Sequence, residues 1–175
     1  TITTSDGLPV GGAQLQAYSD SGNPSRSTTT NPDGSYSITN LAPGTYRLII
    51  HGVNSSVISG LNGTWYTEYL ASNIDVTQST TKNVSLPQFF TVTGTVVDSS
   101  GSPVSGAGVS VYSGGYSSPF GSLSANAITD SSGQFSFKAT NFSYRATLTP
   151  PLNSSYAQTI IDFNVQADLS RNFVI

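Results

Sequence analysis

The sequence predicts an all-β protein made of two tandem β-sandwich domains, residues 1–88 and 89–175. Three observations lead to this prediction: one pattern occurs twice along the chain, apolar residues alternate in short runs, and turn sequences separate those runs. Period-two alternation is typical of half-buried strands, and no long stretch carries a helical stripe. Each domain should hold about six or seven strands in two facing sheets.

The repeat covers both halves of the chain. GLPVGGAQLQAY, from Gly7, matches GSPVSGAGVSVY, from Gly101. TNPDGSYSI matches TDSSGQFSF, with Gly34 equivalent to Gly133, and TYRLII then matches SYRATL. KNVSL, from Lys82, matches RNFVI at the end of the sequence. Because one unit is used twice, the two halves should share a fold.

Alternation and turn chemistry place the elements in order. In the first copy the alternating apolar residues are Leu15 and Ala17, Tyr36 and Ile38, Tyr46, Leu48 and Ile50, Ile74 and Val76, and Val84 and Leu86. The residues expected in the core of the second copy are Val109, Val111, Phe135, Phe137, Leu148 and Val165. Turns with positive φ are expected at Asp33-Gly34, Pro43-Gly44, Asn62-Gly63, Ser100-Gly101 and Ser132-Gly133.

The two copies differ at their beginnings. Thr95 aligns with Thr1, so Phe89–Gly94, most of the first strand of the second copy, have no counterpart in the first. We therefore expect a truncated first strand in domain 1, with an apolar slot beside Leu15 and Ala17 and unpaired backbone groups. Two explanations stay open: the chain is a fragment, or a neighbouring subunit donates a strand. Donation would be a head-to-tail contact, which propagates as a fibre when it does not close.

The motifs also carry a family resemblance. Their order is Gly-x-Pro-Val-x-Gly-Ala, then Thr-Asp-x-x-Gly-x-Phe/Tyr, then Leu-x-x-Gly-x-Tyr-x-Leu. This order resembles the carboxypeptidase regulatory-like domain, a transthyretin-like or Ig-like sandwich, and is similar to collagen-adhesin B-type repeats. The resemblance covers both halves and implies the fold, but such modules serve enzymes, adhesins, surface layers and filaments alike. Repeat two departs from it at Asn141–Tyr144, where the Pro-Gly turn is missing.

Composition places the protein outside the cytosol. Only 9% of residues are charged and there is no Cys, while Ser and Thr are abundant. The six Lys and Arg are scattered, which excludes a nucleic-acid-binding stripe. No apolar run approaches the length of a membrane span, and this stretch holds no signal peptide. We expect a secreted or cell-surface protein.

Catalytic and metal chemistry find little support. His51 is the only His and Glu68 the only Glu, so neither a triad nor a pair of catalytic carboxylates is indicated. The acids fall largely in turn signatures. Oxygen ligands for Ca²⁺ could come from Asp98, Asp130 and Asp162, or from Asp6, Asp33 and Asp75, but neither set forms a calcium loop. No enzyme, metal or cofactor is expected. In the related adhesin repeats a Lys–Asn isopeptide bond is common, but neither first strand here holds a Lys, so none is expected.

Two kinds of candidate site remain. Aromatic residues that could stack on sugar rings are Trp65, Tyr66, Tyr69, Tyr116 and Phe120. The residues of TWYTEY alternate between two faces, with Trp65 and Tyr69 on one face and Tyr66 on the other. Only one of these faces can point outward, so part of the run belongs to the core. Sequons for N-glycosylation occur at Asn54, Asn62, Asn83, Asn141 and Asn153.

The sequence therefore favours a non-enzymatic structural protein of the cell surface: an adhesin stalk, a surface-layer component or a filament subunit. Its expected partners are copies of itself or other surface proteins. The alternative is a carbohydrate-binding or accessory module of a secreted hydrolase, with polysaccharide as the partner. The third hypothesis is that the protein is an enzyme in its own right. Self-association favours the first, and retardation on polysaccharide gels the second.

Overall fold

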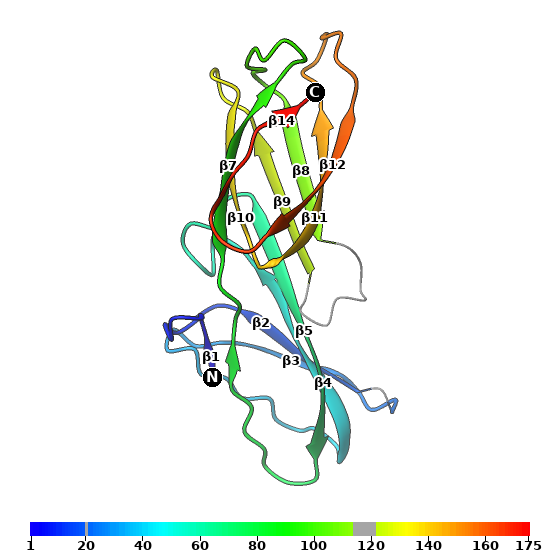
Figure 1. Cartoon of the computed structure of the whole chain (residues 1–175). Helices are drawn as coiled ribbons and strands as arrows, with labels where there is room; N and C mark the ends of the chain where they lie inside the picture. Colours follow the sequence, from blue (N-terminus) through cyan, green and yellow to red (C-terminus); the bar gives the residue numbers. More distant parts are fainter. Residues whose placement is uncertain (20, 114–121) are drawn as a thin grey trace. The chain divides into compact units, whose positions relative to one another are not determined.

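The protein is all-β and divides into two compact units (Figure 1). The computed structural model describes residues 1–19, 21–113 and 122–175, with the backbone alone for 68–73, and no helix occurs in these ranges. Among the described residues, unit 1 comprises 1–19, 21–59, Tyr66–Gln88 and Ser122. Unit 2 comprises Gly60–Trp65, 89–113 and Leu123–Ile175.

Unit 1 is built on an antiparallel sheet with the order β3-β2-β4-β5. Its strands are β2 (Gln14–Ser19), β3 (Arg26–Thr29), β4 (Gly44–Val53) and the unit 1 part of β5 (Thr64–Val76). Leu15 pairs with Ile50 and Ala17 with Leu48, and all four side chains are buried. The alternation in the sequence thus marks the inward face of this sheet.

The second layer of unit 1 is short. β1 (Ile2–Thr3) pairs in parallel with β6 (Val84–Ser85), and the Ile2 N–H also donates to the Gly34 carbonyl at 2.8 Å. The strand expected at Tyr36 and Ile38 is absent, since 35–40 have no strand conformation. A segment forms a strand only beside a partner, and no described segment pairs with 35–40.

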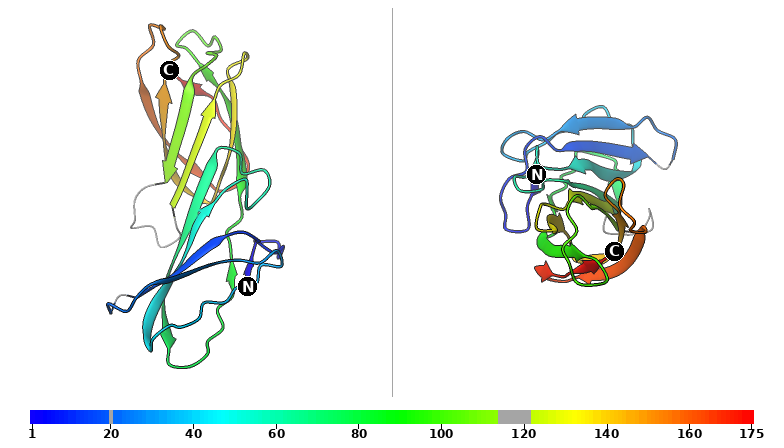
Figure 2. Two further views of the ribbon diagram at one scale, coloured as in Figure 1. Left: turned by 180° about the vertical axis from the view of Figure 1, so that it is seen from behind. Right: turned by 90° about the horizontal axis from the view of Figure 1, so that it is seen from above.

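Unit 2 is a complete sandwich (Figure 2). One sheet has the antiparallel order β12-β11-β8-β9. Its strands are β8 (Gly108–Ser113), β9 (Ser122–Ile128), β11 (Phe142–Thr149) and β12 (Thr159–Val165). In the facing layer, β7 (Phe90–Val97) pairs antiparallel with β10 (Gln134–Ala139) and parallel with β13 (Leu169–Ser170) and β14 (Phe173–Val174).

The predicted core of the second copy is confirmed. All six predicted residues are at most 5% exposed: Val109, Val111, Phe135, Phe137, Leu148 and Val165. Phe135 stacks on Phe173 with 5.0 Å between ring centroids, and Tyr144 stacks on Phe163 at 5.7 Å. Aromatic packing between the two layers therefore fills unit 2.

The missing Pro-Gly turn of the second copy leaves a tyrosine contact unchanged. The Tyr46 hydroxyl donates to the Ala42 carbonyl at 3.0 Å, and the Tyr144 hydroxyl donates to the Thr140 carbonyl at 3.1 Å. Each tyrosine thus reaches back four residues along the chain. Burial raises the pKa of Tyr144. Each hydroxyl bond holds the start of the strand that contains its tyrosine, β4 or β11.

Gly60–Trp65 belongs to unit 2 although it lies in the first half of the sequence. The Asn126 N–H donates to the Gly63 carbonyl at 2.8 Å, and the Thr64 hydroxyl lies 3.1 Å from the Lys138 carbonyl. Leu61 is only 2% exposed. The segment is therefore anchored by both backbone bonds and apolar burial.

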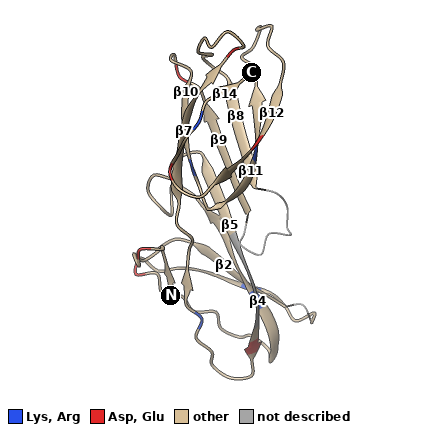
Figure 3. Cartoon of the chain, in the orientation of Figure 1, with Lys and Arg blue, Asp and Glu red and all other residues tan. Residues whose placement is uncertain are grey.

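Charged residues are few and scattered in both units (Figure 3). Arg145 and Asp162 form an ion pair that spans 2.8 Å and is well exposed. Across the described residues, no helix has the length and apolar character needed to cross a bilayer.

Candidate functional site

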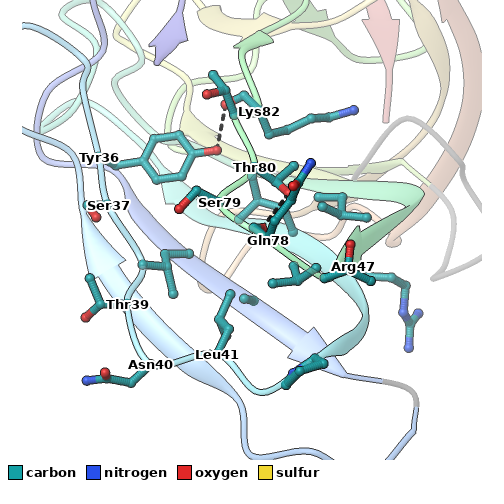
Figure 4. A pocket seen from close by; sticks show the side chains of 18 of the residues that line it. Tyr36, Ser37, Thr39, Asn40, Leu41, Arg47, Gln78, Ser79, Thr80 and Lys82 are labelled. Carbon is teal, nitrogen blue, oxygen red and sulfur yellow. Dashed lines mark hydrogen bonds between the residues drawn. The ribbon is translucent and has the colours of Figure 1, made fainter.

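The candidate site is a groove of about 580 Å³ in unit 1 (Figure 4). Its two walls are 36–41 and 77–82, and Ala17, Leu48 and Ile74 line it between the walls. We call this the unit 1 groove. Neither wall has strand conformation, and Asn40 has a left-handed backbone with a φ of 58°. The groove thus lies where a sandwich ordinarily has a strand.

Unit 2 shows what occupies the equivalent place. The equivalent positions in the two copies are Thr1 and Thr95, Tyr36 and Phe135, Ile38 and Phe137, Lys82 and Arg171, and Asn83 and Asn172. In unit 2, β7 lies between the segments that correspond to the two walls, pairing with β10 on one side and with β13 on the other. The part of β7 from Phe90 to Gly94 makes these pairs. The unit 1 groove therefore has the position of a β7-type strand.

The hydrogen bonds beside the groove match those of unit 2. The amino group of Thr1 donates to Asn83 Oδ1 at 2.8 Å, and the Thr95 N–H donates to Asn172 Oδ1 at 3.1 Å. Likewise the Ile2 N–H donates to Gly34 at 2.8 Å, as Val96 N–H does to Gly133 at 2.9 Å. The two copies thus hold this strand in the same way from Thr1 and Thr95 onward.

The two units differ in how far they cover the aromatic wall. Phe135 and Phe137 are 5% and 2% exposed beneath β7, whereas their counterparts Tyr36 and Ile38 are half-buried. The Tyr36 hydroxyl donates across one end of the groove to the Lys82 carbonyl at 2.7 Å, as Figure 4 shows. Burial raises the pKa of Tyr36. The wall is therefore shaped like a core surface but lies partly open to water.

The groove has little charge. Arg47 and Lys82 line it, and none of its described lining residues is acidic. Most of the remaining side chains are hydroxyl, amide or aliphatic groups. Such a lining suits an extended neutral peptide, which can bond through its backbone and bury alternate apolar side chains. It lacks the paired acids or activated nucleophile of a catalytic cleft.

The slot expected beside Leu15 and Ala17 corresponds only in part to this groove. Ala17 lines the groove, but Leu15 is fully buried and β2 has a partner strand on each side. The opening lies instead along the walls 36–41 and 77–82. Sequence reasoning missed Lys82 and Tyr36 as facing residues, although the repeat alignment with Arg171 and Phe135 was the signal that could have found them.

The aromatic candidates fall into three places. Trp65 is 53% exposed, whereas Tyr66 is 1% exposed and its ring presents no face to a ligand, because alternation turns it inward. The side chain of Tyr69, and the whole of Tyr116 and Phe120, lie outside the described residues. Of the two whose side chains are described, only Trp65 has an exposed ring.

The candidate glycosylation residues lie at the surface. Asn62, Asn83, Asn141 and Asn153 are exposed, and Asn54 is half-buried. Asn54 Oδ1 accepts from the Ser56 N–H at 2.9 Å, which leaves the amide nitrogen outside that bond. Asn153 has a φ of 64°. Glycosylation at these residues stays a prediction.

The described residues show no cluster of side chains of the kind that catalysis or metal binding requires. His51 Nε2 lies 3.1 Å from Gln16 Oε1, which is a cross-strand contact. Asp98 Oδ1 accepts from the N–H groups of Ser100 and Ser102, and hydrogen bonds led by the Ser100 side chain lower its pKa. No group of three potential metal ligands occurs among the described residues. The aspartates act as turn residues.

The chain belongs to the carboxypeptidase regulatory-like domain family. The family model matches it twice, over residues 1–86 and 91–175. The two matches agree with the tandem sandwich copies expected from the internal repeat, and the family assigns the fold. No curated protein matches the chain.

Several solved structures are similar to this chain at low identity. The shaft pilin SpaA from Lactobacillus rhamnosus GG is 16% identical over 99% of this chain and 91% of its own, with a TM-score of 0.42. A streptococcal ancillary pilin is 15% identical over 98% of this chain and 60% of its own, with a TM-score of 0.45. A DUF3823 family protein from Parabacteroides merdae is 18% identical over 51% of this chain, with a TM-score of 0.40.

The chain spans less than half the length of the first solved structures that it matches, 46%, 38% and 32% of them. Similarity at this level assigns no activity.

Proposed function

We propose that this protein is a non-enzymatic structural component of an extracellular surface, and that it joins a second copy of itself by strand addition at the unit 1 groove. The observation that carries the proposal is the difference between the two copies. One fold, used twice, is closed by β7 in unit 2 and keeps a groove of about 580 Å³ at the same place in unit 1.

Physical chemistry favours a strand as the occupant. A groove between two segments outside the sheets offers backbone donors and acceptors on both sides. An added strand can bond to them while its alternate side chains cover the apolar wall. Tyr36 and Ile38 form that wall and are only half-buried. A sugar or small metabolite would satisfy fewer of these backbone groups.

A second copy of the same protein is the partner that the sequence itself supports. Phe90–Gly94 is paired on both sides in unit 2, and it indicates the kind of strand that would fit this place in the fold. Acceptor groove and donor strand are different surfaces, so the contact is head-to-tail and extends into a filament unless it closes into a ring. The low charge and the absence of Cys agree with an extracellular assembly.

The test uses native extracellular material, imaged by electron microscopy and then labelled by lysine acetylation before and after dissociation. The chain has two lysines, Lys82 at the groove and Lys138 in unit 2. We expect filaments or arrays in which Lys82 is protected from acetylation and becomes reactive on dissociation. Lys138 donates to the Thr91 hydroxyl at 2.7 Å within unit 2 and serves as the internal control.

Monomeric native material with equal Lys82 labelling would overturn this proposal. The same monomer retarded on polysaccharide gels would establish the alternative of a carbohydrate-binding module.

A further inference from the structure

We infer that unit 2 binds a neutral polysaccharide chain on the outer face of its β12-β11-β8-β9 sheet, at a row of three side chains: Tyr112, Arg145 and Asp162. We call these residues the outer row. This inference goes beyond strand addition, because it concerns another class of ligand and a surface of the other unit. The outer row lies in unit 2 and the groove in unit 1, so either proposal can fail alone.

The register of the sheet places the three side chains in one row. They stand on neighbouring strands, β8, β11 and β12 (Figure 1), and Arg145 pairs with Tyr112 on one side and with Asp162 on the other. Tyr144 and Ala146, which flank Arg145, are 2% and 0% exposed, so alternation turns the outer row away from the core. With strands about 4.8 Å apart, the row is roughly 10 Å long, which suits two linked sugar rings.

The two copies use an equivalent Tyr and Arg pair differently. In unit 1, the guanidinium carbon of Arg47 lies 5.1 Å from the centroid of the Tyr18 ring and covers it. In unit 2, Arg145 is instead bonded to Asp162, with Nε donating to Oδ1 at 2.8 Å and Nη2 donating to Oδ2 at 3.0 Å. The carboxylate draws the guanidinium towards β12, and the Tyr112 ring, 47% exposed, can offer a face to a ligand.

The outer row combines the groups that recognise a sugar. An exposed aromatic face packs against the apolar face of a sugar ring. The two bonds to Asp162 use two of the five N–H groups of Arg145, and each carboxylate oxygen keeps a further lone pair. Hydrogen bonds from Arg145 lower the pKa of Asp162, so the acceptor is ionised at neutral pH. Neighbouring sugar hydroxyls both donate and accept, and therefore match this pair.

The surroundings favour a neutral sugar over other partners. Ser124 pairs with Tyr112, and the next outward row is formed by Ser110, Thr147 and Ile160. Hydroxyl groups thus dominate, and one exposed isoleucine and one tyrosine make a small apolar area for the centre of a protein interface. The charges of Arg145 and Asp162 cancel, which leaves little attraction for a polyanion.

The test is affinity gel electrophoresis of the whole chain. The gels contain soluble dextran, mannan or hydroxyethyl cellulose, which are neutral, or polygalacturonate, which is anionic. We expect retardation by at least one neutral polysaccharide and none by polygalacturonate. The dependence of mobility on polysaccharide concentration gives the dissociation constant.

Variants locate the binding. Tyr112→Ala and Asp162→Ala should each bind about tenfold more weakly, because each removes one kind of sugar contact. Both residues are exposed, so the fold should be kept, and Tyr112→Phe, which retains the ring, should still bind. Tyr18→Ala is the matched control: it removes the equivalent tyrosine, whose ring Arg47 covers, and should leave binding unchanged.

Several outcomes would overturn the inference. They are normal mobility in all three neutral gels, retardation by polygalacturonate alone, unchanged binding by Tyr112→Ala, and equal losses in Tyr18→Ala and Tyr112→Ala. None of them alters the protection of Lys82 that tests strand addition. Conversely, retardation that depends on Tyr112 would support the outer row even if the native material forms no filaments.

Discussion

Gly63 combines a left-handed backbone with a close contact. Its φ is 71°, and a Cβ there would overlap the Asn126 carbonyl oxygen. Gly60 has a φ of 88° with nothing within 4 Å of its Cβ position. Gly60→Ala should therefore cost about 1–2 kcal/mol from the backbone conformation alone, and Gly63→Ala clearly more.

Urea unfolding of the two glycine variants measures this difference. Because both glycines belong to unit 2, the loss should appear in the unfolding of that unit. Equal loss in the two variants would show that Gly63 does not approach Asn126.

Aspartates in turns link stability to pH. Hydrogen bonds from Ser35 and Ser100 lower the pKa values of Asp33 and Asp98, and the Arg145 guanidinium lowers the pKa of Asp162. A depressed pKa in the folded state gives stability above the ordinary value of 3.8, and this stability is lost as the pH falls through the folded value. The melting temperature should thus fall between about pH 5 and about pH 2.

The matched variant combines Asp33→Asn, Asp98→Asn and Asp162→Asn. It keeps a side-chain oxygen acceptor in each turn but cannot titrate, so its melting temperature should depend less on pH. An unchanged pH dependence would assign the effect to other carboxylates.

Phe135 tests the packing of unit 2. It is 5% exposed and stacks on both Phe137 and Phe173. Phe135→Ala should lower the free energy of unfolding by about 3–5 kcal/mol, because it leaves a cavity between two fixed layers. A loss below about 1 kcal/mol in urea titrations would contradict this packing.

At the scale of elements, β10 and its counterpart 35–40 have similar sequences but different structures. QFSFKA forms a six-residue strand beside β7, while the equivalent SYSITN does not. Amide hydrogen exchange should therefore be faster at 37–40 than at 136–139, since the second set donates within a sheet.

The same pair of elements shows what the sequence can and cannot predict. Alternation located Leu15, Ala17, Phe135 and Phe137 on inward faces, because burial of one face is a local property of the pattern. It also predicted a strand at Tyr36 and Ile38, which was wrong because strand formation depends on a partner elsewhere in the chain.

The site was predictable only in outline. The missing counterpart of Phe89–Gly94 indicated an opening in the first copy. Its walls at 36–41 and 77–82 depend on how chain segments far apart in sequence come together, and single-sequence patterns do not contain that information. The membership of Gly60–Trp65 in unit 2 is of the same kind.

At the scale of the whole molecule, the tandem copies and the family were readable from the repeat, since one pattern covers both halves. The proposed domain boundary between 88 and 89 stays a prediction, because Gly60–Trp65 contributes to unit 2 from the first half of the chain.

The parallel pairing of β7 with β14 has a mechanical consequence. The two strands are the first and last of the second copy, and they lie side by side in the same direction, with the Ile175 N–H bonded to Val97 at 2.9 Å. Tension that pulls the ends of this copy apart therefore loads these bonds in shear, all at once, rather than peeling them one by one. Unit 2 should keep its length under drag until the whole row ruptures, a property suited to a tether.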